Sequence, residues 1–196
     1  MDVVTAILTR RSERYLTEPA PDTDEFADLL KAAATAPDHG LLRPWRWILV
    51  RDTERVALGA CFAADAGSDR PDQTSAKALR APLLATLVFQ PRLGHKIPEW
   101  EQLAATSSMN HALMLLLHAR GYGSIWRTGA FTDSPSAHQL LGLRPDERLL
   151  GWLYIGTPSR EQALPPRAPE DFSDKLSSLE LDGFFRSDLA VAPQSK

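Results

Sequence analysis

The sequence predicts a single domain of α/β or α+β architecture, because segments of helical periodicity alternate along the chain with short apolar runs of strand length. The length of 196 residues is close to that of one domain. A hydrophobic content of 43% is too high for a disordered chain. The only cysteine, Cys61, has no partner for a disulfide and is expected on the apolar face of a helix.

Four longer helices are predicted from apolar spacing and capping signals, over residues 2–11, Asp24–Ala36, a segment capped by Thr53, and Glu99–Arg120. Asp22 and Glu25 have the spacing of a capping box before the second helix, and Pro37 ends it. Gly121 ends the long helix, whose second half is apolar nearly all round, as in a core or a subunit interface. Ser134 and Pro135 predict the start of one more helix.

Three apolar runs predict strands, at Trp45–Val50, Leu83–Phe89 and Leu149–Ile155, and Gly123–Thr128 is expected to form a short strand or turn. The second run is continuously apolar, which predicts a strand covered on both faces. Residues 13–23 and 38–44 are expected to be loops, and Gly67–Ser75 a mobile surface loop. Prolines change the character of the chain after Ser159, so residues 161–196 are expected to form an extension of a domain over residues 1–160 that could wrap a partner subunit.

Charge and hydropathy exclude several classes of protein. The formal net charge of −3 argues against a general nucleic-acid binder but allows a local site for one phosphate. No apolar run approaches the roughly 20 residues that span a bilayer, and the N-terminus does not resemble a signal peptide. Together with the single cysteine, these observations predict a cytoplasmic protein.

Most familiar catalytic motifs are absent from the sequence. Gly121 and Gly123 begin like a dinucleotide fingerprint, but the third glycine is missing and the order runs from helix to strand. The five histidines have no companions at the spacing of metal ligands, so no metal site is predicted. No catalytic triad or pair of carboxylates is present to supply a nucleophile or general acid.

Two separate basic clusters with hydroxyl groups are suited to one phosphate. Arg10, Arg11 and Ser12 end the first predicted helix, and a second cluster lies at Trp126, Arg127 and Thr128. Arginine donates paired hydrogen bonds to phosphate oxygens, and serine or threonine adds a short one. An equally good interpretation is that Arg10 and Arg11 only complement the dipole at the end of their helix.

Six ordered blocks of the sequence resemble the flavin-dependent nitroreductase family, and most closely its compact YdjA-type branch. These blocks, which cover about residues 1–160, are Ile7–Ser12, Ala36–His39, Pro44–Trp45, His95–Glu101, Gly121–Gly129 and Leu153–Pro158. The resemblance implies an α+β three-layer sandwich with a central, mostly antiparallel sheet flanked by helices. It also implies an intertwined homodimer with FMN at each subunit interface.

The resemblance further implies roles for individual residues. Arg10, Arg11 and Ser12 would hold the phosphate and ribityl chain of FMN, His39 would approach the ring from the partner subunit, and Trp126, Arg127 and Thr128 would line the other side. The implied activity is ping-pong hydride transfer from NADH or NADPH through the flavin to a nitroaromatic, a quinone or another small conjugated acceptor, with no catalytic side chain.

One departure from the family keeps an alternative open. Thr35 stands where a basic residue is expected to help hold the cofactor. The alternative is therefore an FMN-binding carrier or regulatory flavoprotein that does not turn over NAD(P)H. A specialised flavin reaction under a closed lid is a further possibility, for which only Gly67–Ser75 offers a long enough loop.

Overall fold

The computed structural model describes residues 1–67, 69–159 and 170–179. The chain divides into two units, Met1–Pro165 and Pro166–Lys196. The described part of the second unit contains one 3-10 turn, η4 (Ser173–Lys175), beside which Phe172, Leu176 and Leu179 are exposed. Most of the predicted extension, including its prolines, lies outside the described residues.

The described part of the first unit alternates helices and strands as predicted. Its helices are α1 (Val3–Thr9), α2 (Thr23–Ala33), α3 (Asp52–Asp65), α4 (Pro71–Ser75), α5 (Glu99–Ala119) and α6 (Pro135–Leu140). Its strands are β1 (Leu16–Thr17), β2 (Trp45–Val50), β3 (Leu83–Phe89), β4 (Gly123–Arg127) and β5 (Arg148–Pro158). The 3-10 turns η1 (His39–Leu41), η2 (Ala76–Leu79) and η3 (Ala130–Asp133) lie between them.

The five strands form one sheet in the order β1-β5-β3-β2, with β4 also paired to β5. Every strand pair is antiparallel, which confirms the predicted α+β class. β5 is the organising strand, because β1, β3 and β4 all form hydrogen bonds to it. The register of β3 against β5 shifts between Leu87 and Val88, opposite Gly151.

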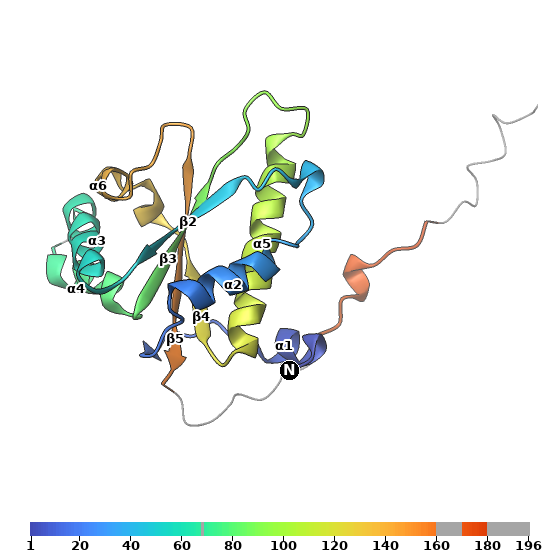
Figure 1. Ribbon diagram of the computed structural model, residues 1–196, viewed down its shortest axis with the longest axis horizontal. Coiled ribbons are helices and arrows are strands. Elements are labelled where there is room, and N and C mark those ends of the chain that lie inside the picture. The colour runs from blue at the N-terminus through green and yellow to red at the C-terminus, as the bar shows by residue number, and fades with distance from the viewer. Residues whose placement is uncertain (68, 160–169, 180–196) are drawn as a thin grey trace, which may run out of the picture. The chain divides into compact units, whose positions relative to one another are not determined.

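Helices cover both faces of the sheet, so the first unit has three layers (Figure 1). Leu83, Ala85 and Leu87 of β3 pack with α2 and α5, whereas Leu84 packs with α3 and α6. All seven residues of β3 are buried, which confirms the prediction of a strand covered on both faces. Apolar burial on both faces fixes the register, because a slip of one residue would exchange the two sets of side chains.

The predicted caps are largely confirmed. The carboxylates of Asp2 and Asp22 accept hydrogen bonds from the backbone N–H groups of Thr5 and Glu25, at 3.0 and 2.8 Å. The Ser134 hydroxyl accepts from the backbone N–H of Ala137 at the start of α6. These contacts satisfy N–H groups that have no partner within the helices.

Three local predictions were wrong. Thr53 does not cap α3, because β2 leads into the helix through Arg51 alone and the helix has begun by Asp52. Residues 71–75 form α4 rather than a mobile loop, with Pro71 at the first helical position and Thr74 buried. Residues 16–17 of the predicted loop form β1, which pairs with the end of β5.

A buried carboxylate joins one end of the sheet to the turn before β5. Glu147 accepts hydrogen bonds from Nε and Nη2 of Arg46 at 2.9 and 2.8 Å and from Nε2 of Gln90 at 2.7 Å. The backbone N–H of Arg144 donates a further bond at 2.9 Å. These contacts, with that to Arg46 the strongest, lower the pKa of Glu147 from 4.5 to about 2.

We expect Glu147→Gln to lower the free energy of unfolding by about 2–4 kcal/mol at pH 7, because the Arg46 guanidinium loses its ionic partner. Because the folded-state pKa is depressed, the wild-type contribution is present above pH 4.5 and is lost as the pH falls toward about 2. The variant should therefore lose less stability than wild type over this interval. Urea unfolding at several pH values measures both effects.

The control is Asp146→Asn, which changes a neighbouring carboxylate with one 3.4 Å contact to Arg144. An equal loss of stability in both variants would contradict the role of Glu147.

Candidate functional site

All the predicted site residues except His39 lie on β4, just after it, or along its outer edge. Ser12 forms a parallel bridge with Ser124, and the backbone N–H of Glu13 donates to the Ser124 carbonyl at 3.0 Å. A Cβ on Gly123 would lie 2.9 Å from Cγ of Glu13, so glycine permits this close approach. The segment that follows α1 therefore runs beside β4, and a cavity lies at each end of this contact.

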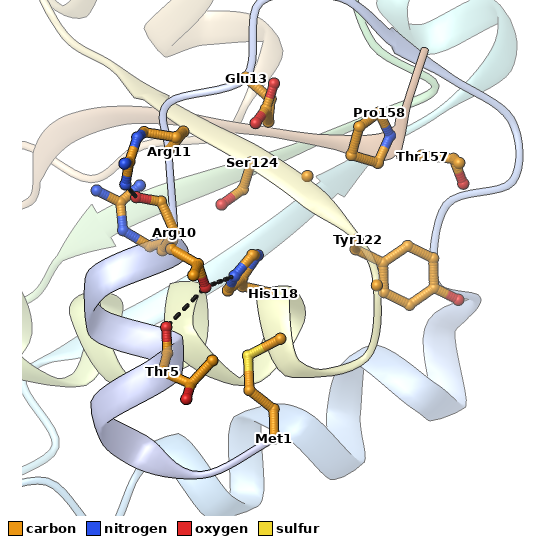
Figure 2. Close-up of a pocket in the computed structure, with 13 residues that line it drawn as sticks. Met1, Thr5, Arg10, Arg11, Glu13, His118, Tyr122, Ser124, Thr157 and Pro158 are labelled. Atoms are coloured by element: carbon orange, nitrogen blue, oxygen red, sulfur yellow. Dashed lines mark hydrogen bonds between the residues drawn. The ribbon is translucent and has the colours of Figure 1, made fainter. Parts of the chain in front are cut away.

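The first cavity, the helix-end pocket, has a volume of about 490 Å³ and lies where α1 and α5 end. Figure 2 shows Arg10 and Arg11 on one side of it, Tyr122 on the other and His118 between them. The Thr9 hydroxyl lies 2.8 Å from Nε2 of His118 and donates to the Thr5 carbonyl. Burial, then the nearby charge of Arg10, lowers the pKa of His118, which favours a neutral ring at neutral pH.

The second region, the basic cleft, consists of two cavities of about 440 and 710 Å³ that share Arg80, Ile125 and Arg127. Lys77 lines one of them and Arg14 the other. Among the described residues that line the basic cleft, four are cationic and none is Asp or Glu. The cleft therefore presents concentrated positive charge within a protein whose net charge is −3.

Aromatic rings form one wall of the basic cleft. Phe62 stacks on Phe131 with 4.5 Å between ring centroids and meets Trp152 edge-on at 4.9 Å. Nζ of Lys77 lies 4.8 Å from the centre of the Phe131 ring, and the Arg127 guanidinium 5.4 Å from that of Tyr154. Burial raises the pKa of Tyr154 to about 12, so its hydroxyl stays neutral. The cleft can therefore hold a planar ring and an anion together.

Two N–H donors in this region have no hydrogen-bond partner among the described residues. They are Nε of Arg127 and Nε1 of Trp152, both inaccessible to solvent. Buried N–H groups normally form hydrogen bonds, because each unsatisfied donor costs about 1–3 kcal/mol. Both groups donate only, so their matching partners are oxygen or nitrogen acceptors.

Backbone packing at Gly151 sets the position of Arg127. Gly151 has a φ of +110°, and a Cβ there would lie 2.2 Å from the Arg127 carbonyl oxygen. It occupies the irregular point of β5, where β4 and β3 pair on opposite sides. Only glycine adopts this conformation and allows this approach without displacing β4.

The structure brings together some of the predicted site residues and separates others. Trp126, Arg127 and Thr128 line the same cavity of the basic cleft. Arg10 and Arg11 line the helix-end pocket, and Ser12 joins the two regions through its bridge to Ser124.

His39 is not among the residues that line either region. It lies on η1, where its Nδ1 is 2.7 Å from Oε2 of Glu101 at the start of α5. Its side chain is 67% exposed, so it remains accessible to a second molecule. Its assignment to the flavin, like the other residue roles, stays a prediction.

Sequence reasoning missed three cations of the basic cleft, namely Arg14, Lys77 and Arg80. Lys77 and Arg80 are three residues apart in the segment before β3, a spacing that places side chains near one another on a helical turn. Arg14 lies two residues after Ser12, with Glu13 between them. Neither position belongs to a recognisable motif, and only the folded sheet places them near Arg127.

Comparison with known proteins gives a consistent result. The model of the nitroreductase family matches residues 7–157. The chain is 34% identical over 175 residues to YdjA of Escherichia coli, whose name assigns it to the NAD(P)H nitroreductases, with 87% of this chain and 96% of YdjA covered. It is 32% identical to YfhC of Bacillus subtilis, similarly named, over 83% of this chain and 88% of YfhC.

Solved structures show the same fold. A nitroreductase-like family protein from Bacillus cereus superposes with a TM-score of 0.79 at 25% identity, covering 92% of this chain and 97% of that one. NfnB from sphigopyxis sp. strain HMH, described as an FMN- and NADPH-dependent nitroreductase, gives a TM-score of 0.72 at 20% identity, covering 92% of this chain and 99% of NfnB. No described helix is long and apolar enough to cross a membrane.

We expect Gly151→Ala to lower the free energy of unfolding by more than 2 kcal/mol, because the new methyl group meets the Arg127 carbonyl in a conformation that alanine disfavours. Gly142→Ala is the matched control, since Gly142 also has a positive φ, of 60°, but a Cβ there would have no neighbour within 4 Å. Denaturant unfolding compares the two variants. Equal losses would show that backbone strain alone, and not the contact with β4, makes Gly151 necessary.

Proposed function

The chain belongs to the nitroreductase family of oxidoreductases, and we propose that it is an FMN-dependent NAD(P)H oxidoreductase whose cofactor binds along the outer edge of β4. The observation that carries the proposal is the basic cleft, with its four cations, its aromatic wall and no described carboxylate. The relatives support it through their names, which refer to NAD(P)H for YdjA and to FMN and NADPH for NfnB.

The residues of the cleft fit the chemistry of FMN. The cofactor carries an anionic phosphate and a planar ring with several oxygen and nitrogen acceptors, which match a lining of cations, aromatic rings and donors. The buried Nε of Arg127 supplies one donor for such acceptors. We assign the ring to the cleft, near Trp126, Arg127 and Thr128. The phosphate and ribityl chain would follow the edge of β4 out of the cleft to the segment Arg10–Ser12, whose two arginines line the helix-end pocket.

When bound, FMN supplies the redox chemistry, by accepting a hydride from NAD(P)H and giving it to an oxidised acceptor. The protein supplies position and charge. Arg14, Lys77, Arg80 and Arg127 stabilise negative charge within the cleft. The neutral Tyr154 and the rings of Phe62 and Phe131 exclude water from one side. NAD(P)H and the acceptor would use the same exposed surface in turn, which makes the cycle ping-pong.

The acceptor is proposed to be a nitroaromatic, a quinone or another small conjugated molecule. A planar compound can stack in a site bounded by aromatic side chains. Among the described residues that line the cleft, none is Cys, His, Asp or Glu, and hydride transfer through a flavin requires no side-chain nucleophile. The single unpaired Cys61, whose pKa is raised by burial, suits a reducing cytoplasm, which we propose as the location.

We also propose that two chains form a homodimer that completes each site. The face of α1 carries four exposed apolar side chains, Val3, Val4, Ile7 and Leu8, of which Val3 is 65% exposed. Such a surface on one short helix is typical of a protein interface. It adjoins α5, the predicted interface helix, through the contact of Thr9 with His118. His39 of the partner subunit would then approach the flavin.

Thr35 favours the alternative of a flavoprotein that binds FMN without turning over NAD(P)H. Its hydroxyl donates to the Ala32 carbonyl at 2.8 Å and so completes the end of α2. Because threonine is uncharged, Thr35 adds no positive charge toward a cofactor.

Anaerobic absorbance spectroscopy separates the two functions. We expect the purified protein, with FMN added, to show a flavin band that NADH or NADPH bleaches and that a quinone then restores. A bound flavin that neither nucleotide bleaches would favour the carrier. Protein that retains no FMN would contradict both functions.

A further inference from the structure

We propose that Asp65, outside the basic cleft, is a positioning residue that holds the Phe131–Lys77 wall of the cleft and thereby sets the space open to the acceptor. The inference rests on the proposed function for the identity of that acceptor. The arrangement of the wall itself follows from contacts within the described residues.

Asp65 is the last residue of α3, and its carboxylate accepts hydrogen bonds from the start of α6. Oδ2 accepts from the Ser134 hydroxyl and, at 2.9 Å, from the backbone N–H of Ser136. Oδ1 accepts from the Ser136 hydroxyl at 2.8 Å. Ser134 in turn accepts from the backbone N–H of Ala137, so one carboxylate organises the entire first turn of α6. These hydrogen bonds, chiefly that from Ser134, lower the pKa of Asp65 and favour its charged form.

The first turn of α6 is continuous with the wall of the cleft. The turn η3 ends one residue before Ser134, and the Ser134 backbone N–H donates to the Phe131 carbonyl at 3.2 Å. Phe131 stacks on Phe62, which lies one turn before Asp65 on the same helix. The α3 helix therefore fixes Phe131 twice, by ring stacking at Phe62 and by hydrogen bonding at Asp65.

Lys77 depends on the same ring. Its Nζ lies 4.8 Å from the centre of Phe131, a cation–π contact that directs the charge along the wall. If η3 moves, Phe131 loses its stacking contact with Phe62, and Lys77 loses its cation–π contact with Phe131. Asp65 is exposed and lines neither cavity, so its effect on the cleft has to pass through η3.

The test compares Asp65→Ala, which removes all three contacts, with Ser136→Ala, which removes only the side-chain hydroxyl. Asp72→Asn is the control, because Asp72 is an exposed carboxylate on the adjacent α4 for which the structure gives no side-chain hydrogen bond. The first readout is ¹⁹F NMR of protein labelled with 4-fluorophenylalanine, with the Phe131 resonance assigned by Phe131→Tyr. This readout requires neither FMN nor turnover.

We expect the Phe131 resonance to shift or broaden in Asp65→Ala, to change less in Ser136→Ala and to stay as in wild type in Asp72→Asn. An unchanged resonance in a folded Asp65→Ala protein would overturn the proposal. If Asp65→Ala does not fold, Asp65→Asn, which keeps one acceptor oxygen, takes its place with the same expected order.

The second readout is steady-state kinetics with menadione as the acceptor. We expect the KM of Asp65→Ala to rise about fivefold or more, with kcat and the Kd for FMN within twofold of wild type. A change in FMN affinity without a change in KM would assign Asp65 to cofactor binding and overturn the proposal. If wild type has no activity but the NMR shift is present, the proposed function fails and the positioning role of Asp65 stands without the assignment to an acceptor.

Discussion

The contact of β4 with β5 at Gly151 is the constraint on which the site depends. β5 receives β3 on one side and β4 on the other, and its irregular point admits the Arg127 carbonyl where any side chain would collide with it. This contact determines where β4 ends and where Arg127 enters the cleft. Helices packed on both faces of the sheet then hold β5 in place, so the geometry of the site follows from the register of the core.

The basic cleft is positively charged although the protein as a whole has a formal net charge of −3. Cations from three separate parts of the chain, before β1, before β3 and at the end of β4, gather around the basic cleft. Gathering like charges costs free energy unless an anion neutralises them, and this cost is why we propose that an anionic cofactor binds there. No Asp or Glu is among the described residues that line the basic cleft with these cations.

The sequence is a good guide wherever the signal is local. Apolar runs locate β2 and β3 to the residue, and the caps at Asp22 and Ser134 are where the spacing predicts them. The start of α3 and the helix α4 were missed, because each depends on how a short connection packs against its neighbours. The cations Lys77 and Arg80 were missed for a related reason, since they line the cleft with Arg127 only when the fold brings η2 near β4. FMN was predicted from the resemblance to a family. The cleft that we propose for it was found only in the structure.

The affinity for FMN shows whether the edge of β4 binds the cofactor through Arg127, as we propose. Quenching of flavin fluorescence gives the Kd for wild type, for Arg127→Gln and for Lys31→Gln, whose exposed lysine pairs with Asp28 on α2. We predict a Kd at least tenfold higher for Arg127→Gln, equivalent to about 1.4 kcal/mol, and a Kd within twofold of wild type for Lys31→Gln. An unchanged Kd in a folded Arg127→Gln protein would contradict the account.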